Sequence, residues 1–414
     1  MRIALVALVA LVLAPAAAAW TPISTTPLQN IDHPAVLRTS AGTELVAWDD
    51  DNSGLWLWSS KGSARQIATV AFVNQPQLVQ QPSGAIQIYA GGGAGVVRFQ
   101  STDDGATWTG PFKIVSPTTT GPVVSATVRS DGTPMFTQDS TFGINVFQGL
   151  NGEVSHQVFS ACCGYAEALA VDTNNYAQVA FWSNANAFPN LFVYEGLDAA
   201  GGQAGPGRAF GQPQTAPRDD SVPLVADGSG NTFMGWAGGY PTATSFAVNA
   251  FQGGNLGWSG VVAGGSFSGG DPHMALATDP SSHLWAVWSQ GNSVHARRSR
   301  SAAHHFGAAT AGGLAEATVY QLSAIALPDG RVDALINDGH QISHQTFLPG
   351  LTVAATKKTA TVLDDGFGVK ATLKGGGHTV HTSAAGKASL AVFKKGTRIV
   401  AGAAGYAPAS FKRP

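Results

Sequence analysis

A short strand–turn–strand pattern recurs about seven times along this chain and constrains its fold more than any other feature. Each copy has an apolar run, a Gly- or Asp-bearing turn, and a second apolar run. The turns are Ser40–Gly42, Pro82–Gly84, Ser130–Gly132, Asn174–Asn175, Gly228–Gly230, Asp279–Ser282 and Pro328–Gly330. The last residues of successive copies, from Trp48 to Leu335, lie 41 to 54 positions apart. This period predicts a propeller or solenoid, in which one unit cannot bury its own apolar face.

The units read as strands rather than helices, because the apolar runs are short and bounded by turn residues. Composition agrees, since the chain has 51 Gly and 22 Pro and only 12% charged residues, against about 25% in an average soluble domain. We therefore expect an all-β chain with a seven-bladed β-propeller. Six blades remain an alternative if the weak seventh copy only closes the ring.

The first 19 residues have the features of a secretory signal peptide. Arg2 precedes an apolar run from Ile3 to Leu13, and Ala17–Ala19 supply a small-residue cleavage site. The run is shorter than the roughly 20 residues that a membrane span needs, so we expect an exported protein, secreted or at the cell surface, without a membrane span. The formal charge of −2 gives no argument for nucleic-acid binding.

One local motif points to a family. Ser101, Asp103, Gly105 and Trp108 have the S-x-D-x-G-x-x-W spacing of the Asp-box. The motif resembles the turn between the third and fourth strands of blades in sialidase-like (BNR-repeat) β-propellers. The Asp can accept backbone N–H bonds within such a turn, and Gly can take a positive φ. The resemblance implies a propeller over residues 20–350 and a structural role for these four residues.

The sialidase active site does not carry over by the same comparison. That family clamps a sialic-acid carboxylate with arginines, the first of which stands just before the first inner strand. Here Asp32, in Asp32-His33-Pro34, occupies that position, and an acidic group would repel a carboxylate. We therefore expect no catalytic residues and a non-catalytic binding function.

Residues that enter the inner strands of a propeller ring one face, where ligands usually bind. Our candidate ligand-binding residues at this mouth are Asp32, His33, Asn74, Gln75, Tyr165, Glu167, Asp220, Asp271, His273 and Gln321. The plainer alternative is that strand starts are polar because they are solvated. The acidic excess favours a cation or a neutral polyol, such as a carbohydrate, over an anion.

Cys162 and Cys163 are neighbours and are the only cysteines. In an oxidising compartment we expect a vicinal disulfide between them, which would lie beside Tyr165 at the mouth. Two buried thiols or an intermolecular bridge are the alternatives. Adjacent residues do not meet the preferred disulfide separations in ordinary geometry.

Two weaker patterns have plain interpretations. The run from Asp49 to Gly54 resembles the front half of a calcium loop, but Ser60 stands where the bidentate Glu should be, so we expect a solvated acidic turn and no metal or other cofactor. A basic cluster from His295 to His305 is expected at a solvated sheet edge. Trp residues are expected mainly to pack between blades.

Residues 351–414 change to short alternating strands and contain a T-x-x-x-G-x-A turn at Thr382 and a G-Y-x-P ending at Gly405. They resemble small carboxypeptidase-regulatory-like or Ig-like β-sandwiches, which implies a spacer or adhesive unit.

For the whole chain we favour a monomeric protein that recognises an extracellular glycan or surface polymer. A glycoside hydrolase using mouth carboxylates, such as Glu167 with Asp220 or Asp271, and a structural surface protein without a small ligand are the alternatives.

Overall fold

The structure is a computed structural model of the chain. It describes residues 20–24, 34–50, 54–69, 74–92, 95–114, 123–140, 143–159, 164–183, 191–197, 208–210, 222–238, 245–252, 255–264, 273–314 and 319–414. Over these ranges every regular element is a β-strand, so the predicted all-β class is confirmed. In the same ranges we find no helix with the length and hydropathy to cross a membrane.

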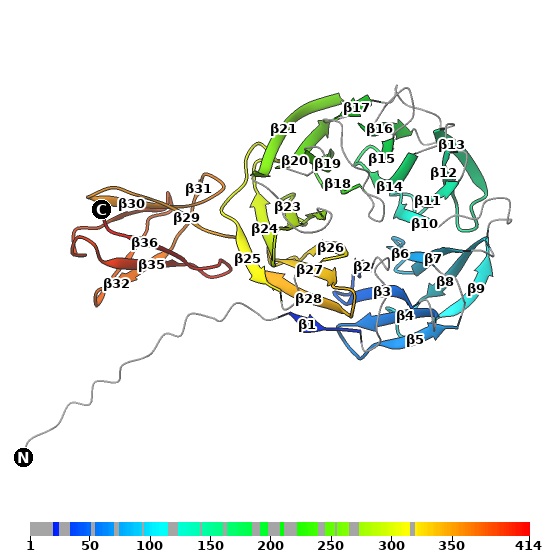
Figure 1. The fold of residues 1–414 in the computed structure, drawn as a ribbon, viewed down its shortest axis with the longest axis horizontal. Helices are drawn as coiled ribbons and strands as arrows, with labels where there is room; N and C mark the ends of the chain where they lie inside the picture. Colours follow the sequence, from blue (N-terminus) through cyan, green and yellow to red (C-terminus); the bar gives the residue numbers. More distant parts are fainter. Residues whose placement is uncertain are drawn as a thin grey trace, which may run out of the picture.

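Seven antiparallel four-stranded sheets follow one another in a ring (Figure 1). The first three contain β2 (Ala35–Arg38), β3 (Glu44–Asp50), β4 (Gly54–Ser59) and β5 (Arg65–Ala68); β6 (Asn74–Gln80), β7 (Ile86–Gly92), β8 (Gly95–Ser101) and β9 (Thr109–Lys113); and β10 (Val123–Val128), β11 (Pro134–Ser140), β12 (Gly143–Gln148) and β13 (Val154–Phe159). The fourth contains β14 (Gly164–Val171), β15 (Ala177–Ser183), β16 (Leu191–Leu197) and β17 (Arg208–Phe210).

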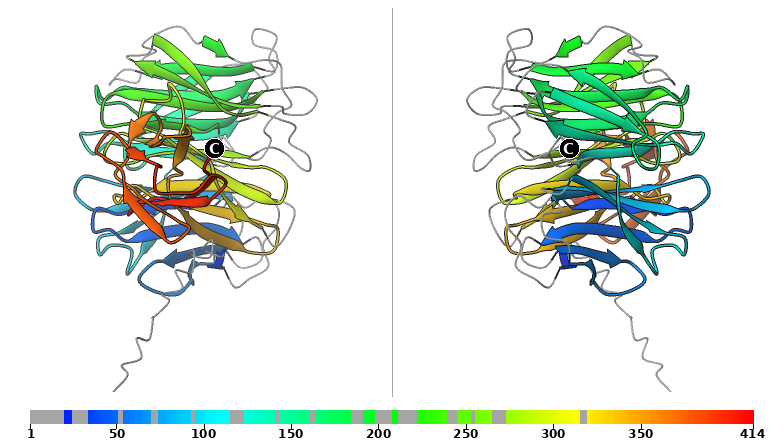
Figure 2. Two further views of the ribbon diagram at one scale, coloured as in Figure 1. Left: turned by 90° about the vertical axis from the view of Figure 1, so that its left-hand side faces the viewer. Right: turned by 90° about the vertical axis from the view of Figure 1, so that its right-hand side faces the viewer.

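The fifth and sixth sheets contain β18 (Leu224–Ala226), β19 (Asn231–Gly238), β20 (Ser245–Gln252) and β21 (Asn255–Gly264), and then β22 (Met274–Thr278), β23 (Leu284–Ser289), β24 (Ser293–Ser299) and β25 (Thr310–Gly313). The seventh contains β26 (Gln321–Ala326), β27 (Val332–Asn337), β28 (Ile342–Phe347) and, from the start of the chain, β1 (Thr21–Pro22). The first strand of each sheet lies nearest the ring axis, and successive strands step outward (Figures 1 and 2).

The turn between the first and second strands is the same in all seven sheets. The residue before the turn, for example Thr39, donates its N–H to the carbonyl of the residue four positions later. The carbonyl of the same residue accepts a hydrogen bond from the N–H of the residue three positions later, here Gly42. That third residue has a positive φ in every case, which explains the choice of Gly or Asn at most copies. The seven residues are Gly42, Gly84, Gly132, Asn175, Gly230, Ser282 and Gly330. The repeat found in the sequence is therefore a repeat of this backbone geometry.

The ring is closed by packing and by one short strand. A cluster of buried apolar side chains lies between every two neighbouring sheets, including the last and the first. β1 pairs with β28, so the N-terminal segment supplies the fourth strand of the seventh sheet. Ser323 also donates a 2.7 Å hydrogen bond to the carbonyl of Pro34 across this seam. The sequence did not predict β1, because two extended residues carry no pattern.

Residues 351–414 form two further sheets beside the ring (Figure 1). One contains β29 (Thr352–Ala355), β30 (Thr359–Asp364), β31 (Phe367–Gly368) and β34 (Lys387–Ser389), and the other β33 (His378–His381), β32 (Thr372–Gly375), β35 (Arg398–Gly402) and β36 (Ala409–Lys412). Both sheets contribute to one buried cluster. β34 ends at Ser389, and Phe393 fills the cluster from the segment that follows it.

The C-terminal module docks on β24 of the ring. Arg298 pairs with Asp364, and Asp365 accepts hydrogen bonds from the Arg300 N–H at 2.7 Å and the Ser301 hydroxyl at 2.8 Å. The solvated sheet edge expected for this basic cluster is therefore wrong for the residues of β24, whereas His304 and His305 are exposed. β24 pairs with β25 on one side, and Arg298 is only 6% exposed because the module covers it.

Candidate functional site

The residues expected at the mouth lie at one end of the inner strands wherever the structure describes them. Glu167 lies in the first half of β14, His273 directly precedes β22, and Gln321 begins β26. All three are buried, at 0%, 7% and 0% exposure. They are therefore not the freely solvated strand starts of the plainer alternative.

The remaining mouth residues are described in part or not at all. Gln75 has a positive φ of 48° within β6, and for Asn74 and Tyr165 only the backbone is described, in β6 and β14. The others lie outside the described residues, as does the expected disulfide: Asp32, His33, Asp220, Asp271, Cys162 and Cys163. Convergence of these side chains on one hollow thus stays a prediction.

Three consecutive inner strands carry a bulge near this same end. The pairing register shifts between Asn74 and Gln77 in β6, between Val123 and Ala126 in β10, and in β14 between Tyr165 and Ala168. A bulge inserts an extra residue and redirects the side chains around it. Gln75 and Glu167 both lie within such shifts, a feature typical of strand ends that form binding sites.

The ring axis itself is narrow. A cavity of about 200 Å³ lies there, lined by all seven inner strands. Most residues that line it have apolar side chains, with Gln77, Ser125 and Ser323 as polar members and no arginine, but its exposed wall is mainly polar. Because small-molecule sites usually measure roughly 300–1,000 Å³, the axial cavity is too small to hold an oligosaccharide. A ligand at this end would rest above the channel.

The Asp-box residues form a compact turn between β8 and β9. Asp103 accepts hydrogen bonds from the Thr107 N–H at 2.8 Å and the Thr107 hydroxyl at 2.6 Å, and Ser101 accepts the Gly105 N–H at 2.9 Å. These bonds hold the pKa of Asp103 at about 2, the Thr107 hydroxyl contributing most. Trp108 packs against the cluster between the first two sheets. The turn stabilises the sheet and offers no reactive group.

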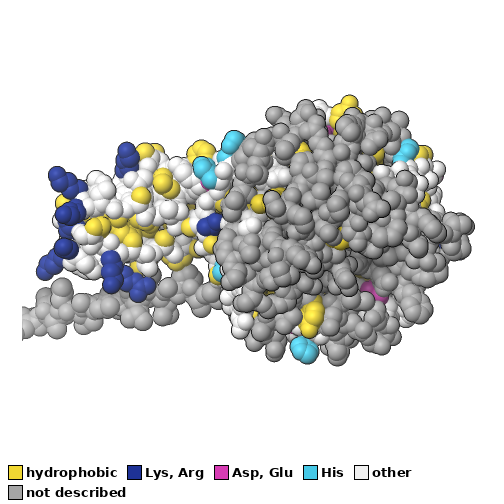
Figure 3. Space-filling view, turned by 45° about the horizontal axis from the view of Figure 1, so that its top comes forward, with side chains coloured by type: hydrophobic (Ala, Val, Ile, Leu, Met, Phe, Trp, Pro, Cys, Tyr) yellow, Lys and Arg dark blue, Asp and Glu magenta, His cyan; other side chains and the backbone are white. Residues whose placement is uncertain are grey.

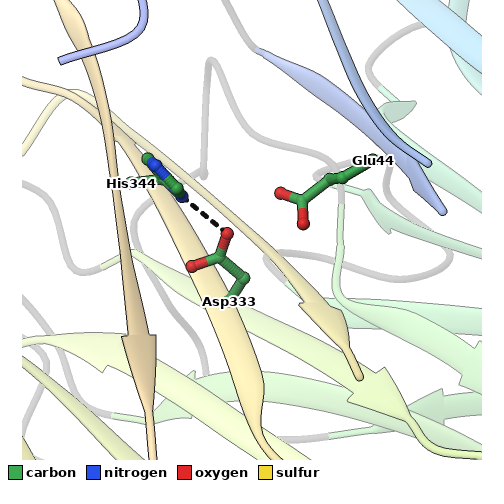
Figure 4. A group of neighbouring side chains, drawn as sticks. All are labelled: Glu44, Asp333 and His344. Atoms are coloured by element: carbon green, nitrogen blue, oxygen red, sulfur yellow. Dashed lines mark hydrogen bonds and ion pairs between the residues drawn. The ribbon is translucent and has the colours of Figure 1, made fainter. Parts of the chain in front are cut away.

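A second group of chemically active side chains lies between the first and last sheets, where no sequence motif marks a site. Glu44 begins β3, while Asp333 and His344 come from β27 and β28 (Figure 4). His344 Nδ1 lies 2.7 Å from Asp333 Oδ2, and one ligand atom of each of the three residues lies within 4.8 Å of the others. Sequence reasoning missed the group because its members are remote in the chain.

Burial and mutual repulsion dominate the electrostatics of this group. Burial, and then the neighbouring Asp333 carboxylate, raise the pKa of Glu44 to about 8. The hydrogen bond to Asp333 raises the pKa of His344 above its usual value. Near neutral pH the metal-free group therefore keeps a proton on Glu44, which can bridge to Asp333.

Other residues weighed for function are structural where they are described. Asp49 and Asp50 are 1% and 5% exposed, so the expected solvated acidic turn is wrong for these two. Trp56 and Trp58 pack in the cluster between the first and last sheets, and Trp285 is fully buried. Trp285 is therefore not available to stack on a sugar, whereas Trp56 and Trp58 are half-buried against their cluster.

Comparisons with known proteins support the fold alone. No family model matches the sequence, and a search of curated proteins finds no match. Among solved structures, a catalytically inactive virginiamycin B lyase from Staphylococcus aureus with quinupristin aligns at a TM-score of 0.50 and 12% identity, over 80% of this chain and 98% of its own. Kuenenia stuttgartiensis hydrazine synthase aligns at 0.50 and 12%, over 77% and 96%.

A Hadza microbial sialidase, Hz136, aligns at a TM-score of 0.44 and 11% identity, over 77% of this chain and 66% of its own. That similarity is too low to carry an argument about family. The chain is similar to these proteins in having small antiparallel sheets in the propeller arrangement. Because unrelated activities share this arrangement, function has to be argued from the chain's own residues, and the comparisons place it among proteins with the β-propeller fold.

Proposed function

We propose that this chain is an exported, non-catalytic carbohydrate-binding protein that attaches to an anionic surface polysaccharide through its C-terminal module. In this interpretation the signal peptide is residues 1–19, and the ring, residues 20–350, is a seven-bladed sialidase-like propeller. Residues 351–414 are a small Ig-like sandwich. The seven four-stranded sheets, the closed series of packing clusters and the Asp-box turn support the architecture.

The observation that carries the function is the separation of charge. Residues 351–414 contain eight lysines and two arginines against two aspartates, whereas the rest of the chain contains 13 Lys and Arg against 23 Asp and Glu. Asp364 and Asp365 are 0% and 3% exposed, both buried against the ring. All eight lysines are exposed, and Figure 3 shows cationic side chains gathered toward the module's free end. The exposed side-chain charge of the module is therefore entirely positive.

Lysine chemistry favours a flexible polysaccharide over nucleic acid. Eight of the ten cations are Lys, which act as point charges, whereas bidentate phosphate recognition favours Arg. Single-stranded nucleic acid also needs aromatic platforms. The one large aromatic side chain strongly exposed on the module is Phe367, at 45%. The Arg300 guanidinium lies over its ring, 4.7 Å from the ring centre. A carboxylated polysaccharide requires neither feature.

The second part of the proposal is a glycan site above the ring axis. Glu167, His273 and Gln321 supply buried polar groups at the entry ends of three inner strands. The narrow axial cavity would leave such a glycan above the channel, at the ends of the inner strands. This site would take a neutral or cationic glycan, because the acidic residues expected around it disfavour an anion.

Binding to the module can be tested with polygalacturonate, an anionic polysaccharide, and dextran, a neutral one. A protein beginning at Trp20 should bind polygalacturonate more tightly than dextran, and only the affinity for polygalacturonate should fall steeply with salt. Changing Lys357, Lys358, Lys394 and Lys395 to Glu should weaken binding at least about tenfold, since four charges change sign. The control reverses Lys61 and Lys113, which are exposed on the ring, and it is matched in number by the reversal of Lys394 and Lys395 alone.

Three results would contradict this assignment. One is binding that survives the fourfold reversal, and another is an equal loss in the ring control. The third is a preference for duplex DNA or anionic vesicles over polygalacturonate at the same salt concentration. In a parallel assay, mass spectrometry of a glycan library would detect cleaved products, and such products would overturn the non-catalytic part of the proposal.

A further inference from the structure

The seam at which the ring closes contains the one group of three possible metal-ligating side chains found among the described residues. Glu44 from the first sheet faces Asp333 and His344 from the last (Figure 4). In the register of the seventh sheet, His344 lies opposite Thr21 of β1. The start of the chain, the first sheet and the last sheet thus meet at this one point.

Glu44 is buried without full hydrogen bonding. The residue is 6% exposed, and its Oε1 atom has no hydrogen-bond partner among the residues that the structure describes. Figure 4 shows this carboxylate directed toward Asp333 and His344. A buried, unpartnered carboxylate oxygen costs free energy unless something binds it, so the group lacks one component.

The donor set matches a divalent transition-metal ion. Two carboxylates and one imidazole are ligands of Zn²⁺, and three protein ligands plus a water complete a four-coordinate site. Ca²⁺ and Mg²⁺ fit less well, because they prefer six or more oxygen ligands. Ligand atoms around tetrahedral Zn²⁺ lie roughly 3.3 Å apart. The three ligand atoms here lie within 4.8 Å of one another, so small side-chain shifts would suffice.

We propose that Glu44, Asp333 and His344 bind a Zn²⁺-like divalent cation that fastens the first sheet of the ring to the last. The fourth position would be taken by water, which can reach the site past His344, whose side chain is 23% exposed. The ion would supply Glu44 Oε1 with its missing partner. Its binding would displace a proton from the group, and the ion would then compensate the negative charges of both carboxylates in a low-dielectric seam.

Neighbouring side chains already hold the ligands in place. The Thr346 hydroxyl donates a 3.1 Å hydrogen bond to Asp333 Oδ1, and the Trp58 ring lies 5.4 Å from the His344 ring. Such supporting contacts are typical of metal sites. Arg38 and Arg331 are the nearby cations that oppose binding. Arg331 is engaged by Asp329 at 2.5 Å, so much of its charge is already compensated.

The test compares chelator-treated protein with and without added ZnSO₄. Wild-type protein should bind one equivalent by native mass spectrometry, and its melting temperature should rise by at least about 3 °C when Zn²⁺ is well above its dissociation constant. MgCl₂ and CaCl₂ at the same concentration should give no comparable rise. Because the readouts are metal content and melting temperature, the result is independent of any glycan binding.

Two variants and one control separate a metal site from a merely structural cluster. Glu44→Gln should raise the melting temperature of the metal-free protein, because it removes a buried acid, and should weaken Zn²⁺ binding at least about tenfold. His344→Gln should also lose binding. His340→Ala changes an exposed histidine in the β27–β28 turn and should bind Zn²⁺ like wild type. Wild-type protein without a bound equivalent, or Glu44→Gln with unchanged affinity, would overturn the proposal.

Discussion

Arg298 of the ring and Asp364 of the C-terminal module form an ion pair in which the two side chains are 7% and 0% exposed. The Tyr406 hydroxyl donates to the same carboxylate at 3.3 Å. The Arg298 guanidinium lies between the Trp285 and Tyr406 rings, 5.8 and 5.5 Å from their centres. A buried pair with this many contacts fixes orientation, so the module is docked rather than flexibly tethered.

We expect Asp364→Asn to loosen this junction. The change leaves Arg298 buried without its anion, and breaking a buried pair costs about 3–5 kcal/mol. Limited proteolysis should then cut near residues 348–351, and the radius of gyration measured by X-ray scattering should increase. Asp329→Asn, which removes the exposed partner of Arg331, is the control and should leave both measurements unchanged. Equal proteolysis of both variants would contradict the docked arrangement.

The repeated turn gives a prediction about stability. Gly84 has a φ of +89°, and a Cβ atom added there would contact nothing within 4 Å. Gly84→Ala should therefore cost about 1 kcal/mol through backbone conformation alone. Gly62 has the same open surroundings without a positive φ, so Gly62→Ala should be neutral or slightly stabilising. Urea unfolding measures both, and an equal effect at the two positions would argue against the shared turn geometry.

The sequence alone was sufficient to predict the structural features that repeat locally along the chain. Apolar runs and turn residues predicted the all-β class and the position of every first turn, because a positive φ at residues such as Gly42 or Gly330 restricts the amino acid. Features that depend on contacts between remote segments were not predictable in this way. β1, the Glu44 group and the docking of Asp364 each join parts of the chain that carry no shared pattern.

The Asp-box turn should respond to acid. Because hydrogen bonds lower the pKa of Asp103 to about 2 in the folded protein, its contribution to stability is present above about pH 4 and is lost as the pH falls toward 2. Asp103→Asn should cost about 1 kcal/mol at pH 7, the usual value of a hydrogen bond, and less at pH 2.5. Thermal unfolding at the two pH values measures this. Glu153→Gln, on an exposed turn, is the control for losing one carboxylate.

The Glu44 group should make the metal-free protein less stable as the pH rises. Its pKa of about 8 in the folded state exceeds that of the unfolded chain, near 4.5, so the folded state holds an extra proton between these values. The stability contribution is complete below pH 4.5 and is lost as the pH rises through 8. The raised pKa of His344 acts in the same direction.

Unfolding by urea in chelator, from pH 5 to pH 9, should therefore show a decline of a few kcal/mol in wild type, because each pKa unit corresponds to about 1.4 kcal/mol. Glu44→Gln should decline less, since Gln cannot titrate, while the part due to His344 remains. A variant whose stability falls as steeply as that of wild type would show that Glu44 ionises freely in the folded protein. Its carboxylate would then have to be solvated rather than enclosed between the first and last sheets.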